Sequence, residues 1–377
     1  MKYYIIAGEA SGDLYGSNLV KELKVKDPKA DIRAWGGDLM QEQGVHLIKH
    51  YKDHNYMGFL EVVRNLGTIL KNIDFCKKDI KEFNPDALIL IDFPGFNMRI
   101  AKYFYQYSFP VLFYIAPQVW AWKENRVKAI KKYVDRLYVI LPFEKEFLKK
   151  HGIESNYIGH PLLEHILNFK KNLSLSKKEF LVTHSLDVGK PIISLIPGSR
   201  KQEIEKKLPV MLEAVSNYTK EFNIVIAGMR NFKDLYVKIT SNSNIKVIYK
   251  DTYNLLNNSS RALVTSGTAT LETAFFNVPQ IVCYKTSWLS YVIAKTLVKI
   301  KYISLVNLIM NKEVIKELIQ NDLSVFKLTK ELNKLNDDLA LNKMKEAYRI
   351  LITKCQGENV SKNIATDMLK TIESFQK

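Results

Sequence analysis

Two glycine-containing segments in the second half of the chain have the residue types that bind phosphate. The first is "PGSR", in which Gly198, Ser199 and Arg200 follow the apolar run "IISLI". The second is "TSGTATLE" at 265–272, which follows "RALV" and has no acid before its last residue. Small residues leave backbone N–H groups free to donate at the start of a helix, where the helix dipole also favours an anion. An arginine can in addition bind two phosphate oxygens at once.

The second of these segments suits a nucleoside diphosphate. The residues that would donate to the diphosphate are Ser266, Gly267, Thr268 and Thr270. Glu272 follows about one helical turn later, where its two oxygens could accept hydrogen bonds from vicinal ribose hydroxyls. Ordinary helix capping would explain the same residue types, and an exposed surface arginine would explain Arg200 taken alone. Two anion-binding patterns in one half of the chain nevertheless support each other.

One carboxylate in the first half is placed for acid–base chemistry. Asp92 ends the apolar run "ALILI" and precedes Pro94 and Gly95. In open parallel sheets, ligands bind at the carboxyl ends of the strands, so a carboxylate there can act as a general base. The alternative is that Asp92 caps the helix that follows it.

The segment "GEASGD" at 8–13 resembles a phosphate-binding loop but contains two acids. Glu9 and Asp13 would repel a phosphate at the start of a helix. We therefore expect this loop to bind something other than phosphate.

No pattern in the sequence indicates a metal ion or a cofactor, and we expect neither. His160 and His165 flank Glu164 with a spacing that differs from that of zinc proteases, so we interpret them as structural. No D-x-D sequence occurs, so arginine and a helix dipole would have to neutralise a departing diphosphate. The three cysteines are far apart, which favours neither a disulfide framework nor a zinc site and indicates a reducing compartment.

The elements that would position these residues alternate regularly between strands and helices. Short β-rich runs such as "YYIIAG", "ALILID", "PIISLIPG" and "RALVTSG" are separated by amphipathic stretches. Such alternation is typical of parallel sheets with helices on both faces. A chain of 377 residues suits two α/β domains. We therefore predict two doubly wound, Rossmann-like domains that face each other across a cleft.

The boundary between the two domains is predicted in a polar, lysine-rich stretch at 165–188. We assign residues 1–168 to the N-terminal domain, 169–342 to the C-terminal domain and 343–377 to a helical tail. In two-lobed folds of this kind such a tail can cross back to the first domain.

The formal net charge of +17 points to an acidic partner: nucleic acid, an anionic membrane or a phosphorylated substrate. The lysines are spread over nearly every helix without a nucleic-acid-binding motif, so we expect no nucleic acid. No segment reaches the roughly 18 uninterrupted apolar residues of a membrane span, and the first strand is too short for a signal peptide. These features predict a cytosolic protein.

Seven motifs together resemble those of the lipid-A-disaccharide synthase family, which are glycosyltransferases with the two-domain GT-B fold. In chain order they are "GEASGD", "IDFPGFN", "IAPQVWAW" with "RVKAIKKYVDRLYVILPFE", "YIGHP", "PGSRKQEI", "SGTATLE" and "LVKIKYISLVNLI". The resemblance implies that UDP-2,3-diacylglucosamine donates its sugar to the 6-hydroxyl of 2,3-diacylglucosamine 1-phosphate (lipid X). The products would be the β-1,6-linked lipid A disaccharide 1-phosphate and UDP.

The resemblance also implies roles for individual residues. The C-terminal domain would bind UDP, and the N-terminal domain would face the acceptor and the transferred sugar. Asp92 would be the general base of a single inverting displacement. Glu9 and Ser11 would contact sugar hydroxyls, whereas Asp13 would cap its own helix. Asn307, in "SLVNL", matches an asparagine that the family places near the UDP.

The family's membrane-contacting region corresponds to "MGFLEVVRNLGTILKNIDF". Its apolar residues at helical spacing include Phe59, Val62, Val63, Leu66 and Leu70. Periodicity alone favours a core-facing helix of the first domain. With the resemblance, we expect peripheral association with the anionic cytoplasmic face of the inner membrane.

Two other classes of function remain open. Another UDP-N-acetylglucosamine transferase or an epimerase of the same fold would keep the second-half motifs and change the first-half ones. A non-catalytic scaffold at the membrane surface would need only the basic charge. The sequence does not determine the oligomeric state.

Overall fold

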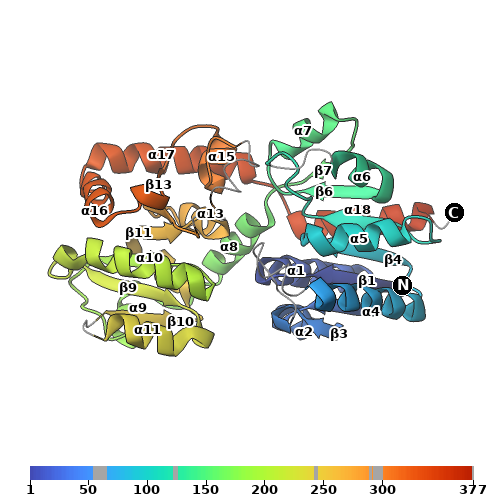
Figure 1. Ribbon diagram of the computed structural model, residues 1–377, viewed down its shortest axis with the longest axis horizontal. Helices are drawn as coiled ribbons and strands as arrows, with labels where there is room; N and C mark the ends of the chain where they lie inside the picture. The colour runs from blue at the N-terminus through green and yellow to red at the C-terminus, as the bar shows by residue number, and fades with distance from the viewer. Residues whose placement is uncertain (54–65, 122–125, 242–244, 288–290, 292–299, 376–377) are drawn as a thin grey trace. The chain divides into compact units, whose positions relative to one another are not determined.

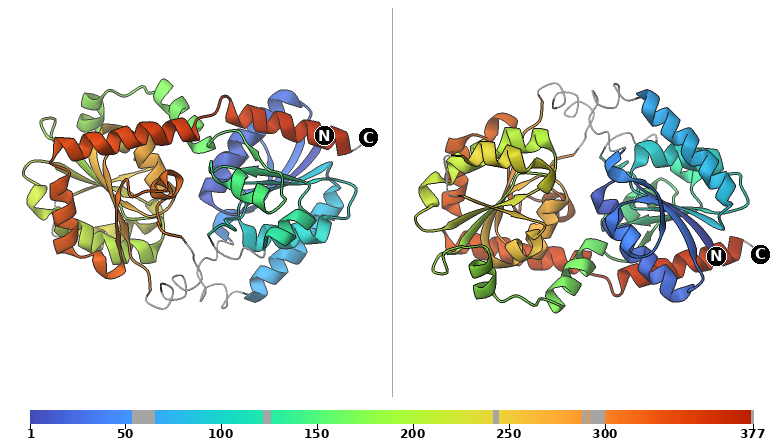
Figure 2. Two further views of the ribbon diagram at one scale, coloured as in Figure 1. Left: turned by 90° about the horizontal axis from the view of Figure 1, so that it is seen from above. Right: turned by 90° about the horizontal axis from the view of Figure 1, so that it is seen from below.

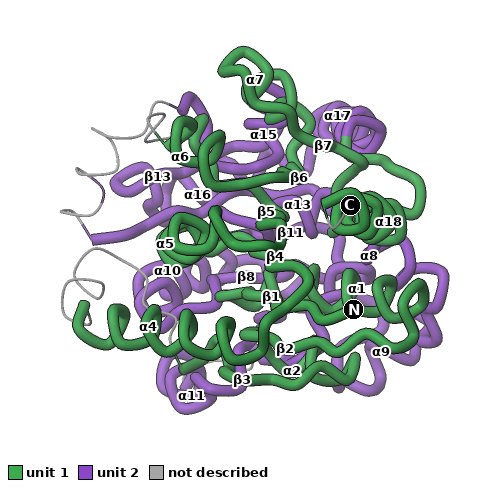
Figure 3. The backbone as a smooth tube through the Cα atoms, turned by 90° about the vertical axis from the view of Figure 1, so that its right-hand side faces the viewer, with its two compact units in different colours: residues 1–164, 294–299, 355–377 green, residues 165–293, 300–354 purple. Residues whose placement is uncertain are grey.

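The computed structural model describes residues 1–53, 66–121, 126–241, 245–287, 291 and 300–375 (Figure 1). The chain forms two compact units, which Figure 3 distinguishes by colour. The first contains Met1–Glu164 and Cys355–Lys377, and the second contains His165–Ile293 and Ile300–Lys354. The chain thus passes between units after Glu164 and again before Cys355, whereas the sequence analysis placed its divisions after residues 168 and 342.

The first unit is built on a seven-stranded parallel sheet with the order β3-β2-β1-β4-β5-β6-β7. Its strands are β1 (Lys2–Ala7), β2 (Asp31–Gly36), β3 (His46–His50), β4 (Ala87–Ile91), β5 (Val111–Tyr114), β6 (Arg136–Val139) and β7 (Asn156–Tyr157). Every residue of β4 and β5 is buried, as expected of apolar runs covered by helices on both faces. The strand order reverses between β1 and β4, so their carboxyl ends form a switch point where ligands bind in such sheets.

Helices cover both faces of this sheet. They are α1 (Ala10–Lys26), α2 (Asp38–Glu42), α4 (Leu66–Phe83), α5 (Pro94–Phe104), α6 (Arg126–Tyr133), α7 (Glu144–Lys150) and α18 (Val360–Phe375), with the 3-10 turn η1 (Tyr51–Asp53). Figure 2 shows α4 and α5 on one face and α1 and α18 on the other. Helix α8 (Pro161–Lys171) leads from this unit into the second.

The second unit is built on a six-stranded parallel sheet with the order β10-β9-β8-β11-β12-β13. Its strands are β8 (Ile192–Ile196), β9 (Asn223–Gly228), β10 (Lys246–Tyr249), β11 (Ser259–Thr265), β12 (Gln280–Tyr284) and β13 (Lys316–Ile319). Here the order reverses between β8 and β11. The prediction of two doubly wound, Rossmann-like domains is therefore confirmed.

Helices of the second unit lie before its first strand, between successive strands and after its last strand. They are α9 (Lys177–Thr183), α10 (Lys201–Ala214), α11 (Lys233–Thr240), α12 (Thr252–Asn258), α13 (Thr268–Phe275), α15 (Leu305–Met310), α16 (Val325–Lys334) and α17 (Asp338–Cys355). The described part of this unit also contains the 3-10 turns η2 (Ser216–Tyr218), η3 (Arg230–Phe232) and η4 (Gln320–Asp322). The core contains buried Leu195, Ile226 and Leu263 from adjacent central strands.

The C-terminal helix α18 belongs to the first unit, where it packs against α1. Asp367 of α18 accepts hydrogen bonds from Arg136 at 3.0 Å, from the Tyr138 hydroxyl at 2.7 Å and from the Asn156 side chain at 2.8 Å. These donors belong to β6 and β7, at one edge of the sheet. The carboxylate therefore joins the end of the chain to the last two strands of the first sheet.

The two passages of the chain between the units touch each other inside the first unit. Gly159 has a φ of +135°, and a Cβ atom at Gly357 would collide with the carbonyl oxygen of Ile158. The His160 N–H donates to the Cys355 carbonyl at 2.8 Å. This close backbone approach requires glycine at both positions.

We predict that Asp367→Asn lowers the free energy of unfolding by about 1 kcal/mol at neutral pH, discounted for partial exposure. Burial alone would raise the pKa of Asp367, but hydrogen bonds from Arg136 and Tyr138 lower it. An acid with a lowered folded-state pKa stabilises above its unfolded pKa, and this contribution is lost as the pH falls through the folded-state value.

Urea unfolding at several pH values measures the effect, with Glu373→Gln on the same helix as the control. The difference between Asp367→Asn and the parent should therefore shrink below about pH 4. A difference that stayed constant through this range would show that the charge of Asp367 does not stabilise the unit.

Candidate functional site

The backbone after β4 is held in an unusual conformation at Asp92. Asp92 and Phe93 have φ angles of +47° and +50°, which are uncommon for residues other than glycine. Two successive left-handed residues cost free energy and persist only where the surroundings hold them. Helix α5 begins immediately afterwards, and no side chain caps it. The alternative role of Asp92 as a helix cap is therefore not seen.

The side-chain amide of Asn97 holds this strained turn. Its Nδ2 donates to the Asp92 carbonyl at 2.7 Å and lies 3.3 Å from the carbonyls of both Ile91 and Ile6. These carbonyls lie at or near the carboxyl ends of β4 and β1, the strands on either side of the switch point. Asn97 is fully buried, and its Oδ1 has no hydrogen-bond partner. The sequence analysis did not select it, because its position suggested only the first turn of a helix.

The loop after β1 packs directly on this turn. A Cβ atom at Gly8 would overlap the Phe93 ring, so only glycine fits there. Glu9 is extended at the start of α1 and makes no side-chain cap, and both Glu9 and Ser11 are partly exposed. Since Ala7 pairs with Ile91 in register, these two residues follow one strand end and Asp92 follows its neighbour.

Asp13 has a different role from the one expected. Its carboxylate accepts N–H bonds from Gly37 at 2.8 Å and from Leu39 and Met40 at 3.1 Å. It therefore caps α2 and not its own helix, because the turn after β2 brings three free N–H groups to it.

Burial raises the pKa of Asp92 to about 6, although a hydrogen bond from the Phe93 N–H partly offsets this rise in pKa. The side chain is nonetheless partly exposed to solvent. At neutral pH most of the carboxylate is therefore ionised, which is the state that accepts a proton.

A second carboxylate, Glu144, lies among the loops that follow the neighbouring strands. It is 2% exposed and accepts hydrogen bonds from Trp120 Nε1 at 2.9 Å, Leu141 N at 2.9 Å and Ile140 N at 3.2 Å. Burial raises its pKa to about 7. Glu144 thus links the loop after β5 to the start of α7. Nothing in the local sequence pattern indicates this link, and Trp120 was expected to have no chemical role.

In the second unit, the "PGSR" segment follows β8 and is held by Glu203 of α10. Gly198 has a φ of +121°, and a Cβ atom there would overlap the Glu203 side chain. The carboxylate accepts the Ser199 N–H at 3.2 Å and lies 3.8 Å from Arg200 Nη1. Arg200 occupies the N-cap position of α10 and its side chain is 49% exposed, so its guanidinium remains accessible to a ligand.

The "TSGTATLE" segment follows β11, which pairs with β8 up to Val264 and Ile196. Gly267 has a φ of +131°, and the space beside its Cα is open. Gly267 is the N-cap of α13, so the first N–H groups of this helix, including that of Thr268, lie beside that space. The two anion-suited segments thus follow adjacent strands at the second switch point.

Two hydroxyls of this segment are already used inside the protein. Ser266 Oγ donates to the Ile303 carbonyl, and Thr270 Oγ1 donates to the Gly267 carbonyl, both at 2.8 Å. Their oxygens can still accept, but the backbone N–H groups are the better donors for an anion.

Glu272 lies one turn into α13 beside an aromatic side chain. The Tyr253 hydroxyl is 3.4 Å from its Oε1, and burial raises the pKa of Glu272 to about 7. Rings of Phe169 and Phe276 contact Tyr253, so the carboxylate sits beside an apolar, aromatic surface.

Asn307 is fully buried and fixes a turn. Its amide donates to Ile315 O at 2.8 Å and Glu317 Oε1 at 2.9 Å, and its Oδ1 accepts from the N–H groups of Val314 and Ile315. Both hydrogens and both lone pairs are used. Direct contact with a nucleotide would therefore require one of these bonds to break.

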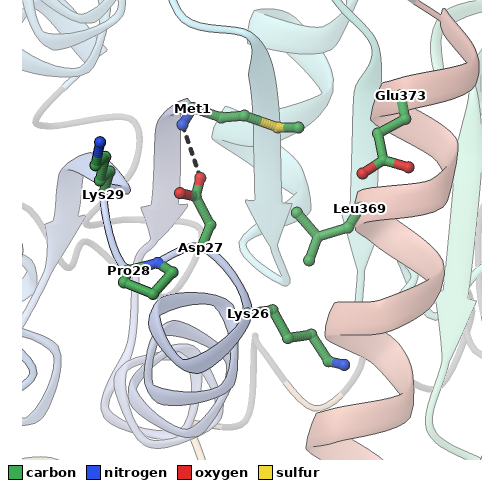
Figure 4. A pocket seen from close by; sticks show the side chains of 7 residues that line it. All are labelled: Met1, Lys26, Asp27, Pro28, Lys29, Leu369 and Glu373. Carbon is green, nitrogen blue, oxygen red and sulfur yellow. Dashed lines mark hydrogen bonds and ion pairs between the residues drawn. The ribbon is translucent and has the colours of Figure 1, made fainter.

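A groove of about 390 Å³ lies elsewhere in the first unit, lined by Met1, Lys26, Asp27, Pro28, Lys29, Leu369 and Glu373 (Figure 4). The Met1 amine pairs with Asp27 at 2.7 Å. Because β1 begins at Lys2, this groove lies at the amino ends of the strands. Asp92 lies at the opposite, carboxyl ends.

Among the residues that the structure describes, no group of three or more histidine, cysteine, aspartate or glutamate side chains is arranged to hold a metal ion. None of the described helices is both long enough and apolar enough to cross a membrane.

Comparison with known proteins identifies close sequence relatives. Residues 3–370 match the family model described as lipid-A-disaccharide synthetase. The lipid-A-disaccharide synthase of Geobacter sulfurreducens is 34% identical over 342 residues, which cover 89% of this chain and 88% of the relative. That of Coxiella burnetii strain CbuK_Q154 is 35% identical over 321 residues, 84% of each chain.

Solved structures with the same fold are much more distant in sequence. The UDP-GlcNAc 2-epimerase of Neisseria meningitidis bound to UDP-GlcNAc has a TM-score of 0.67 at 13% identity, over 99% of this chain and 100% of that one. A glycosyltransferase from Rickettsia africae has a TM-score of 0.58 at 16% identity, over 100% of this chain and 98% of that one. These likenesses establish the fold alone.

We predict that Asn97→Asp destabilises the first unit by about 2 to 4 kcal/mol at neutral pH, because a carboxylate would face three carbonyl oxygens. The substituted acid would have a raised pKa in the folded state. Part of the lost stability should therefore return as the pH is lowered and that acid becomes protonated.

Thermal unfolding across a pH series measures this effect, and Asn84→Asp, at an exposed position in the same unit, is the control. Equal melting temperatures for the two variants at neutral pH would show that the hydrogen bonds of the Asn97 amide do not stabilise the first unit.

Proposed function

The chain belongs to the lipid-A-disaccharide synthase family, and on that premise we propose that it transfers the 2,3-diacylglucosamine unit of UDP-2,3-diacylglucosamine to the 6-hydroxyl of lipid X. The products are the β-1,6-linked lipid A disaccharide 1-phosphate and UDP. Membership of the family makes the protein a glycosyltransferase.

The observation that carries the catalytic part of the proposal is the setting of Asp92. It is a partly exposed carboxylate at a switch point, on a strained turn held by Asn97, with a pKa of about 6. An α-linked donor that gives a β product requires inversion, so one displacement with one base suffices. The acceptor oxygen attacks the sugar C1, its proton passes to Asp92, and the bond from C1 to the phosphate oxygen breaks.

Glu9 and Ser11 are proposed to bind sugar hydroxyls. Both follow the strand end next to that of Asp92, and a carboxylate accepts well from a hydroxyl donor. This proposal explains why a glycine-containing loop at a helix start contains an acid: its ligand is neutral.

The second unit is proposed to bind UDP. The diphosphate would contact Arg200 and the N–H groups at the start of α13, which also stabilise the negative charge that develops on departing UDP. Glu272 would accept from the ribose hydroxyls.

The lipid-linked substrates require access to a membrane surface, and α4 supplies a candidate contact. Leu66 and Leu70 are 46% and 48% exposed, whereas Ile73 and Cys76 of the same helix are buried. Phe59, Val62 and Val63 lie outside the described residues. We propose that the beginning of α4 meets the anionic cytoplasmic face of the inner membrane, helped by nearby lysines.

UDP release with lipid X supplied or omitted tests the proposed reaction. Acylated donor should release UDP only with lipid X, and unacylated UDP-GlcNAc should give much less. Epimerisation of UDP-GlcNAc without UDP release would instead support the related epimerase activity, and no turnover of any UDP-sugar would support a scaffold.

We predict that Asp92→Asn lowers the transfer rate by about 100-fold to 10,000-fold, because the base is lost, while UDP affinity stays near that of the parent. The parental rate should also fall on the acid side of about pH 6, as Asp92 becomes protonated. Rate measurements from acid to neutral pH check both effects.

Asp31→Asn, which removes an exposed carboxylate of the same unit, is the control. A variant at position 92 that kept more than about a tenth of the parental rate would move the base to another residue.

We predict that Leu66→Ser combined with Leu70→Ser reduces binding to vesicles that contain anionic lipid, with only a small change in melting temperature, because both side chains are already half exposed. Added salt should weaken parental binding without abolishing it.

Vesicle flotation measures binding, and Val25→Ser with Leu39→Ser, two other exposed positions of the first unit, provides the control. Equal binding by both double variants would exclude this end of α4 as the membrane contact.

A further inference from the structure

Helix α10 buries a lysine in the second unit. Lys207 is 1% exposed, in contrast with Lys201 on the same helix, whose side chain is 65% exposed. Removing an ammonium group from water costs several kcal/mol unless other groups compensate. A buried lysine at this position therefore needs an explanation that helix formation alone does not provide.

Lys207 connects both of the loops at the second switch point. Its Nζ donates to Oγ1 of Thr265, the last residue of β11, directly before Ser266. Its Nζ also lies 3.9 Å from Oε1 of Glu203. Glu203 in turn accepts the Ser199 N–H. One side chain thus reaches the "PGSR" segment through a carboxylate and the "TSGTATLE" segment through a hydroxyl.

Two charged groups of α10 and its cap lie near Lys207. Glu203 is within 4 Å of both Arg200 Nη1 and Lys207 Nζ. From β12 the titratable groups are Cys283 and Tyr284; burial raises the pKa of the Cys283 thiol to about 12 and also raises that of the Tyr284 hydroxyl. Both are neutral at ordinary pH, so neither adds a negative charge beside the Lys207 ammonium.

The proposed function places the diphosphate of UDP beside these loops, and our inference rests on that proposal. We propose that Lys207 is a positioning residue for nucleotide binding, which fixes the two loops relative to each other and contributes buried positive charge beneath the diphosphate. It does so through Thr265 and Glu203, without itself touching the nucleotide.

The primary test compares Lys207→Met with Lys206→Met, a neighbouring and less buried lysine on the same helix. Calorimetry with UDP should show about tenfold weaker binding for Lys207→Met and parental binding for Lys206→Met. The melting temperature of Lys207→Met should not fall, because an apolar residue replaces a buried cation. A merely structural lysine would show the opposite pattern: lower stability with unchanged UDP affinity in the folded protein.

A second measurement concerns protons. Burial lowers the pKa of Lys207, and a bound diphosphate would raise it again. UDP binding should therefore take up protons, and parental affinity should weaken as the pH rises toward the ordinary pKa of lysine. Calorimetry in buffers of different ionisation enthalpy detects this uptake, which should be smaller in Lys207→Met.

Substitutions of Thr265 keep the test decisive if Lys207→Met fails to fold. Thr265→Val removes the hydroxyl oxygen that accepts the hydrogen bond from the Lys207 ammonium, so this variant should bind UDP more weakly. Thr265→Ser keeps that oxygen and should bind UDP nearly as the parent does. Equal UDP affinities for Thr265→Val and Thr265→Ser would overturn the inference.

Arg200→Ala separates the two proposals. If it weakens UDP binding while Lys207→Met binds like the parent, the nucleotide site stands and the role of Lys207 is wrong. If the parent itself does not bind UDP, both the nucleotide site and the inference are wrong.

Discussion

One buried amide joins two neighbouring strands of the first sheet near their carboxyl ends. At this switch point the Asn97 side chain donates to carbonyls of Ile6, Ile91 and Asp92. The same amide fixes two successive left-handed residues, so the orientation of Asp92 follows from a hydrogen-bonding requirement of the sheet. Gly8 completes the arrangement, because Phe93 occupies the space that a Cβ atom would need.

At the switch point of the second sheet, charged side chains hold the loops instead of an amide. There the carboxylate of Glu203 holds the loop after β8, and the ammonium of Lys207 joins that carboxylate to the end of β11. A neutral amide suits a site where a carboxylate must keep an intermediate pKa, since a nearby cation would lower it. A buried ammonium group beside an accessible guanidinium suits a site for a diphosphate. The two units thus share a topology and differ in electrostatics.

The strand ends were predictable from the sequence, since buried parallel strands form apolar runs and the polar residue after each run marks an end. Asp92, Arg200 and Gly267 were found in this way. Asn97, Glu144 and Lys207 were not, because a polar residue in a helix looks solvated until its neighbours are known. Asp13 was misassigned to its own helix for a related reason: its partners at Gly37 to Met40 are distant in the chain. Local patterns locate where a loop begins, but they do not show which distant groups hold it.

The position of α18 affects the order in which the protein can fold during synthesis. Its buried residues, among them Ile364 and Met368, help to cover α1, and Asp367 joins it to β6 and β7. The ribosome adds about 5 to 20 residues per second, so on the order of ten to forty seconds pass between Glu164 and Cys355. During that interval the apolar surface of the nascent first unit that α18 will cover is exposed. The second unit begins later in the chain, but its last residue is synthesised before that of the first unit. The first unit therefore cannot complete its packing, at the face of α1 that α18 covers, until the last helix leaves the ribosome.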